Sequence, residues 1–291
     1  MSQTVYFKSI IFLLLLVTPP LEAKLLKPSK NGEEKEILII NGKRRLYYPI
    51  KNEGMDYSIE GPIRLEFISR YPVLKNRRES HSFDYNIIIN DEDTITVKHR
   101  FKVQKTIKSV QHPKHSYTYS GNYFINLDKG SHTIRLIENK DRKYPVLVRV
   151  LAKEFGSIGK NKKVLDPSVH QAPIKIITEG KSINYFECNY SYPLQLQTNG
   201  NKTLRILTRL QFTESMGQEE SYRLKVKEGD KIIGTYYFNT ERSSVSEISG
   251  RLDKIPGKWR SCDIKIPKGN HKYIIETLDK RKTVLTRFIV Y

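Results

Sequence analysis

The sequence predicts an all-β protein of two tandem antiparallel β-sandwich domains, jelly-roll-like and related by internal duplication. Three observations lead to this prediction: apolar residues alternate with a period of two, turn residues separate short β-rich runs, and the chain repeats itself after about 139 residues. No stretch keeps the helical period of about 3.6 residues for more than two turns. Short strands with regular turns are typical of sandwiches and barrels.

Alternation is clearest near the end of each copy. Tyr123, Ile125 and Leu127 share one strand face in the first copy, and Ile264 and Ile266 do so in the second. The polar Asn126 and Lys265 occupy positions between them. We therefore expect one face of each strand to lie in a core.

The duplication rests on four matched stretches in the same order. Residues 125–136 match 264–275, because each segment has an alternating strand, a Lys-Gly turn and a second strand that opens with His. Among the other matches, residues 63–65 (Ile-Arg-Leu) align with 204–206 (Leu-Arg-Ile). Offsets between 137 and 141 throughout indicate one domain copied in tandem.

The Lys-Gly turn predicts a hairpin in each copy. We expect Gly130 and Gly269 to adopt a positive φ there, which costs glycine little. His132 and His271 open the apolar strand face that follows. We interpret them as hydrogen-bonded edge residues, with a ligand contact as the alternative.

The composition places the two domains at residues 37–151 and 174–291. Between them, residues 152–173 contain glycines, prolines and a lysine run, which predicts a linker. Residues 24–36 are expected to form a flexible lead-in.

The N-terminus has the pattern of a secretory signal peptide over residues 1–23. Lys8 precedes an apolar run at 10–17, and the segment ends at the small Ala23. The run is shorter than the roughly 20 residues that cross a bilayer as a helix. We expect cleavage after Ala23 and a periplasmic or secreted protein without a transmembrane span; a retained N-terminal anchor is the alternative.

The formal net charge is +20, from 51 basic and 31 acidic residues. A charge of this size attracts polyanions. Outside the cytoplasm these are acidic polysaccharides, anionic lipid headgroups or nucleic acid. The basic residues are spread along the chain, so a solvated lysine-rich surface is the alternative.

The two cysteines, Cys188 and Cys262, lie on apolar strand faces of the second copy. An oxidising compartment favours a disulfide between them, worth roughly 4 kcal/mol on the chain-entropy model. Two buried thiols are the alternative.

Four tyrosines interleaved with basic residues are candidate ligand contacts: Tyr117, Tyr119, Tyr236 and Tyr237. Flat rings beside basic donors suit sugars or single-stranded nucleic acid. Tyrosine is also a common strand former, so a purely structural role is the alternative.

Arg64 and Arg205 occupy matching positions in the two copies and complete the candidate binding set. If their strands are central, each arginine projects from an outer sheet face and contributes to a basic, ring-lined surface. The alternative is a buried arginine paired with a carboxylate.

The Lys-Gly-x-His segment resembles the closing hairpin of galactose-binding-like and carbohydrate-binding β-sandwich modules, over about 12 residues per copy. This resemblance implies a jelly-roll fold and a glycan ligand. The calcium- and sugar-binding residues of those modules cannot be mapped onto this sequence. The general build is also similar to tandem-sandwich proteins of the bacterial envelope that have no assigned activity.

The sequence contains no nucleophile elbow, no zinc-protease motif and no phosphate-binding glycine loop. No metal or cofactor is expected. These features predict a non-catalytic exported binding or scaffolding protein for carbohydrate or another anionic envelope polymer. A structural protein that docks on a protein partner is the alternative, and a hydrolase without a recognisable motif is the third hypothesis.

Overall fold

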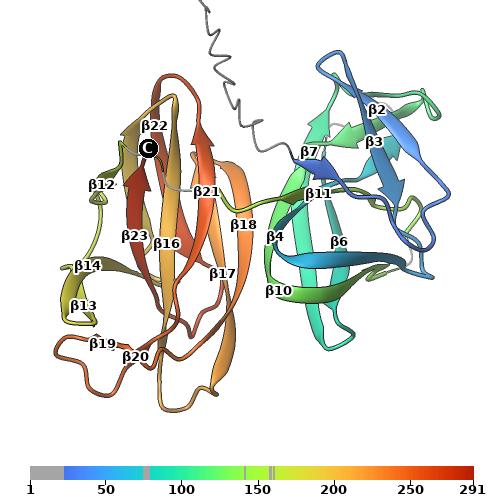
Figure 1. The fold of residues 1–291 in the computed structure, drawn as a ribbon. Coiled ribbons are helices and arrows are strands. Elements are labelled where there is room, and N and C mark those ends of the chain that lie inside the picture. Colours follow the sequence, from blue (N-terminus) through green and yellow to red (C-terminus); the bar gives the residue numbers. More distant parts are fainter. Residues whose placement is uncertain (1–22, 75–78, 141, 157–158, 160) are drawn as a thin grey trace, which may run out of the picture.

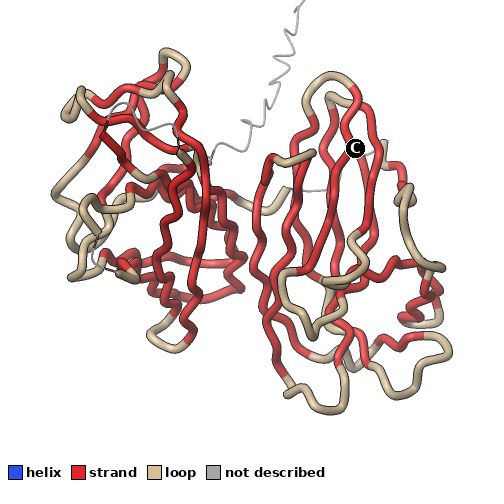
Figure 2. Tube along the Cα trace, turned by 180° about the vertical axis from the view of Figure 1, so that it is seen from behind, coloured by secondary structure: helices blue, strands red, loops and turns tan. Residues whose placement is uncertain are grey.

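The computed structural model describes residues 23–74, 79–140, 142–156, 159 and 161–291. These residues form strands, turns and loops without a helix, which confirms the all-β class (Figure 1, Figure 2). A membrane-crossing helix is accordingly absent from the described part of the chain. The expected signal peptide, apart from Ala23, lies outside the described residues.

The N-terminal half folds into two antiparallel layers that share the long strands β4 (Met55–Arg70) and β10 (Gly121–Glu138). In one layer, the second part of β4 pairs with the first part of β10 and with β11. In the other layer, the second part of β10 pairs with the first part of β4 and with β6, and β6 pairs in turn with β7. The other strands of this half are β1 (Lys24–Leu25), β2 (Glu36–Ile40), β3 (Lys43–Pro49), β5 (Pro72–Leu74), β6 (Ser80–Ile89), β7 (Asp93–Gln104), β8 (Lys108–Ser109), β9 (His115–Thr118) and β11 (Leu147–Lys153).

The C-terminal half has the same order of strand pairing, with each long strand divided in two. Here β15 (Leu194–Asn199) and β16 (Lys202–Phe212) take the place of β4, and β21 (Arg260–Ile266) and β22 (Asn270–Thr277) take the place of β10. The other strands are β12 (Lys163–Leu165), β13 (Ile174–Thr178), β14 (Lys181–Cys188), β17 (Glu219–Glu228), β18 (Lys231–Glu241), β19 (Ser246–Ile248), β20 (Ile255–Pro256) and β23 (Val284–Val290).

Segments expected to be irregular take part in both sandwiches. Within the lead-in predicted over residues 24–36, β1 pairs with β11 and Leu26 packs against the core. Within the predicted linker, β12 pairs with β23. An edge strand of two or three residues is too short for its alternation to be visible in the sequence.

The two halves are joined by a shared sheet and by an exchange of aromatic rings. Strand β10 pairs in parallel with β18, so the sheets of the two halves are continuous. The core of the N-terminal half includes Tyr237 of β18, and that of the C-terminal half includes Phe124 of β10. The ring of Phe124 stacks on Tyr236 with the centroids 4.5 Å apart. Each half therefore completes the core of the other.

The Lys-Gly segment is a sheet corner, and the predicted hairpin is wrong. Gly130 and Gly269 do have positive φ angles of 127° and 115°. However, β10 continues along β4 after a bulge between Leu127 and Gly130, and β21 and β22 lie in different sheets. At the first corner a Cβ on Gly61 would collide with the carbonyl of Asp128. A bulge bends a strand from one layer to the other, and the local pattern of strand, glycine and strand is the same as that of a hairpin.

Cys188 and Cys262 are free thiols, and the predicted disulfide is wrong. Cys188 pairs with Val284, which lies opposite Leu210 of β16, whereas Cys262 pairs with Ile206 of the same strand. The separation of Ile206 and Leu210 is roughly 13 Å along the strand, beyond the about 7 Å between Cα atoms that a disulfide allows. Burial raises the pKa of both thiols to about 12.

Candidate functional site

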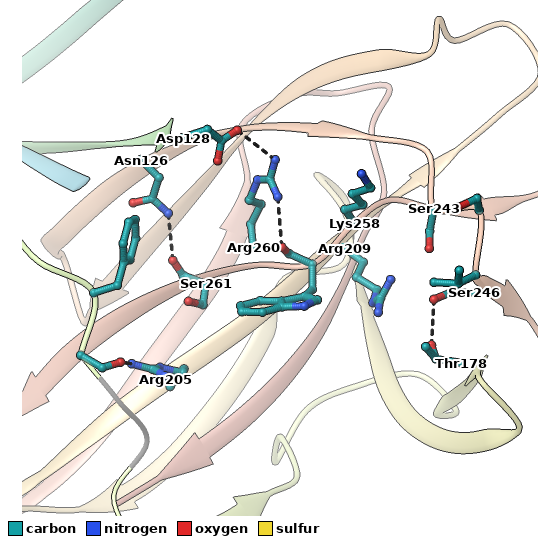
Figure 3. A pocket seen from close by; sticks show the side chains of 15 residues that line it. Asn126, Asp128, Thr178, Arg205, Arg209, Ser243, Ser246, Lys258, Arg260 and Ser261 are labelled. Carbon is teal, nitrogen blue, oxygen red and sulfur yellow. Dashed lines mark hydrogen bonds and ion pairs between the residues drawn. The ribbon is translucent and has the colours of Figure 1, made fainter. Parts of the chain in front are cut away.

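A cavity of about 580 Å³ lies where the two halves meet, and it is the candidate ligand site (Figure 3). Its wall is formed by β10, by the chain that follows β11, by β16 and by the segments on either side of β20. Strands far apart in the sequence therefore converge on one concave surface. Such junctions between domains are common places for ligand sites.

The aromatic part of the wall is Trp259, which lies in the turn between β20 and β21. Its side chain is 56% exposed, although tryptophan normally loses most of its surface on folding. Phe155 and Val245 add further exposed apolar surface to the same wall. An exposed indole in a cavity offers a flat face for stacking.

Asp263 is the centre of a charge cluster that joins the halves beside the cavity. Arg205 donates from Nε and Nη2 to the two carboxylate oxygens of Asp263, at 2.7 and 2.8 Å. Arg64, from the N-terminal half, lies 3.8 Å from the same carboxylate and donates to the carbonyl of Ser261 at 3.0 Å. The hydrogen-bonded carboxylate raises the pKa of Arg205. Two guanidiniums thus share one carboxylate.

Arg64 and Arg205 therefore come together, but they do not occupy equivalent positions. The pairing of Leu65 with β10 and of Leu204 with β21 shows that these two leucines correspond. Arg205 consequently stands where the N-terminal half has Glu66, and the predicted equivalence is wrong by two residues. Both arginines are buried, with 6% and 8% of their surface exposed. The structure therefore supports the alternative interpretation, in which each arginine is buried and paired with a carboxylate, and not an exposed binding surface.

The four candidate tyrosines separate into a buried group and one exposed member. Tyr236 and Tyr237 are buried at the joint between the halves, and the buried Tyr117 donates a hydrogen bond to the carboxylate of Glu36. Tyr119 is 51% exposed and lines a second cleft of about 880 Å³ between the halves. None of the four lines the Trp259 cavity.

His132 and His271 have different hydrogen-bond partners. The Nε2 of His132 donates to the carbonyl of Asp128 at 3.0 Å, and its Nδ1 lies 3.3 Å from the amide of Asn90. The Nδ1 of His271 lies 2.5 Å from the carboxylate of Glu228, which raises the pKa of His271. One histidine therefore has neutral partners and the other an acidic one.

Arg209 of β16 is the basic side chain of the cavity that has no carboxylate partner among the described residues. It is 7% exposed, its Nη1 donates to the carbonyl of Gly257 at 2.9 Å, and its Nε is buried without a partner. By contrast, Lys258 and Arg260 each pair with a carboxylate. The cavity is therefore lined by a cationic side chain whose buried Nε makes no hydrogen bond to the described residues.

Sequence reasoning missed both Trp259 and Arg209. The available signal was the single tryptophan, placed directly after Pro256-Gly257-Lys258, where a turn exposes its side chain. The described residues contain no group of three or more side chains that could hold a metal ion.

The sequence matches no protein-family model and no curated protein. Among solved structures, the chain is similar to the tandem CBM22-1–CBM22-2 domain of Xyn10C from Paenibacillus barcinonensis, with 13% identity over 92% of this chain and 91% of that chain and a TM-score of 0.21. PNGF-II is 9% identical over 84% of this chain and 61% of its own, and the ANX1 ectodomain from Arabidopsis thaliana is 9% identical over 91% and 89%; both have a TM-score of 0.23. TM-scores this low support no conclusion about function.

Proposed function

We propose that this chain is a non-catalytic exported protein that binds a carbohydrate polymer in the cavity around Trp259. The observation that carries the proposal is the exposed indole beside hydroxyl, amide and guanidinium groups at the junction of the two sandwiches. A sugar ring has an apolar face that stacks on an aromatic ring and hydroxyl groups that bind polar side chains. The cavity volume is within the range of about 300–1,000 Å³ typical of ligand sites.

The walls of the cavity are held in place from both halves. Asn126 donates to the carbonyl of Ser261 at 3.1 Å, and the hydroxyls of Thr178 and Ser246 lie 2.8 Å apart at the rim (Figure 3). Asn126 lies on β10, which pairs with β18 of the C-terminal half, whereas the strands that carry Ser261, Thr178 and Ser246 belong to the second sheet. A pre-organised site loses less conformational freedom on binding, which favours affinity.

Export is part of the same proposal. Among the described residues the first strand, β1, starts at Lys24, the residue directly after the expected cleavage point. Cleavage after Ala23 would therefore leave the described sandwich intact. N-terminal sequencing of protein recovered outside the cytoplasm tests this step, and a mature chain that still carries residues 1–23 would contradict it.

A glycan array probed with residues 24–291 at low and high salt tests the binding function. We expect Trp259→Ala to abolish binding without a change in melting temperature, because its side chain stabilises no core. Tyr192→Ala is the matched control, since Tyr192 is also 56% exposed and does not line the cavity. The proposal fails if the wild-type protein binds no glycan or if both variants bind like the wild type.

A further inference from the structure

Arg209 has an unused hydrogen-bonding edge. Its Nη1 is held by Gly257, and no other donor of this side chain makes a hydrogen bond to the described residues. Buried donors without partners are rare in folded proteins, because leaving one unsatisfied costs about 1–3 kcal/mol. The side chain is nevertheless more than nine-tenths buried and borders the cavity.

The same edge binds carboxylates elsewhere in this protein. Arg205 uses Nε and Nη2 to hold Asp263, and Arg135 uses them to hold Asp56 at 2.7 and 3.0 Å. These two donors are parallel, so they match the two oxygens of a carboxylate. In Arg209 the edge has no such partner.

The charges of the side chains around the cavity favour an anionic ligand. Arg205, which shares Asp263 with Arg64, and Lys258 and Arg260 each have a carboxylate beside them, whereas Arg209 has none among the described residues. In the view of Figure 3 the guanidinium of Arg209 lies between Lys258 and Thr178. A guanidinium without a carboxylate of its own favours an anionic ligand, and the two oxygens of a carboxylate match its two parallel donors.

The N-terminal half contains a matched arginine whose Nε and Nη1 both have hydrogen-bond partners. Arg70 and Arg209 lie opposite corresponding residues of β11 and β23. Arg70 donates to the hydroxyl of Tyr47, to the side chain of Gln104 and to the carbonyl of Thr118. The fold alone therefore does not require an unpaired arginine at this position.

We infer that the cavity binds a polysaccharide containing uronic acid, with the carboxylate of one sugar on the free edge of Arg209. The inference rests on the proposed function and names the class of glycan. Trp259 supplies the stacking face for the sugar, and Arg209 distinguishes the acidic sugar from a neutral one.

The test uses oligogalacturonates and oligomannuronates, each as the free acid and as the methyl ester, which differ in charge and little in shape. For the wild-type protein we expect the acid to bind at least about tenfold more tightly than the ester. Arg209→Gln should reduce the affinity for the acid to that for the ester and leave the ester unaffected. Arg70→Gln is the matched control and should keep the preference for the acid.

Several outcomes would overturn the inference and separate it from the proposed function. Equal binding of acid and ester by the wild type, an unchanged preference in Arg209→Gln, or equally strong competition by inorganic polyphosphate would each exclude carboxylate recognition by Arg209. Binding of neutral glycans without any uronate would overturn the inference and leave the proposed function standing. Absence of binding to every glycan would overturn both.

Discussion

The two halves of the molecule use the same arginine position in opposite ways. In the N-terminal half, β9 pairs with β5 and β7 and supplies the Thr118 carbonyl, which closes the structure around Arg70. In the C-terminal half, β20 is two residues long and pairs with the end of β16, and Gly257 beside it supplies one carbonyl to Arg209. Arg70 and Arg209 are buried to nearly the same extent, with 6% and 7% of their surface exposed, so the two halves differ in the hydrogen-bond partners of the arginine.

The replacement of Gln104 by Ser243 at the matching position also contributes to the difference in hydrogen-bond partners between Arg70 and Arg209. Ser243 bonds through its backbone to Pro256, in the register where Gln104 pairs with Tyr117 in the other half. The serine side chain is too short to reach the guanidinium as the glutamine does. The matched arginines thus differ in their hydrogen-bond partners, and four predictions test differences between the two halves.

The largest effect is expected at Asp263, whose position in the N-terminal half is taken by Phe124. Asp263→Asn removes the charge shared by Arg64 and Arg205 and leaves two buried guanidiniums without a carboxylate. We expect the free energy of unfolding, measured by urea denaturation, to fall by about 3 kcal/mol. Glu66→Gln is the control, because its partner Lys153 is partly exposed and the pair contributes about 1 kcal/mol or less. Equal losses in both variants would contradict the prediction.

The second prediction compares the two arginines without ligand. Arg70→Gln removes three hydrogen bonds and should lower the free energy of unfolding by about 2–3 kcal/mol, or the melting temperature by roughly 5–10 °C. Arg209→Gln removes one hydrogen bond and a buried unsatisfied donor, so its melting temperature should stay close to that of the wild type. If calorimetry shows equal decreases, Arg209 is as structural as Arg70.

The third prediction concerns pH and the corner histidines. Glu228 raises the pKa of His271 in the folded state, so the stabilisation is complete below the unfolded value of about 6.5 and is lost as pH rises through the folded pKa. We expect the melting temperature to decrease over that interval and His271→Gln to remove the decrease. His132→Gln is the control, because His132 has neutral partners. An NMR titration midpoint for His271 below about 6.5 would disprove the assignment.

The smallest effect is expected from reductant. Since Cys188 and Cys262 are free and buried, dithiothreitol should leave the melting temperature unchanged within about 1 °C. Burial raises both thiol pKa values to about 12, so alkylation should require unfolding. Mass spectrometry should then find two modified thiols in unfolded protein and none in native protein. A lower melting temperature in the presence of reductant would instead show that Cys188 and Cys262 form a disulfide.

The fold class could be predicted because alternation and turns are local properties of the sequence. The alignment of the two copies could not be predicted correctly in this region. The triplets around Arg64 and Arg205 are more similar in sequence than the segments that the strand pairing matches, in which Leu65 corresponds to Leu204. The cavity could not be predicted from the sequence either. Its wall gathers residues from Asn126 to Ser261, and the free edge of Arg209 depends on which strands cover β16.

The parallel pairing of β10 with β18 has a consequence for the order in which the chain is made. Tyr123–Ile125 are synthesised about 110 residues before their partners Thr235–Tyr237. Until those partners arrive, one edge of β10 and the ring of Phe124 have no cover. Open strand edges with apolar rings promote association between chains. A chain that stops before β18 should therefore aggregate, and a newly made N-terminal half depends on prompt completion of its own C-terminal half.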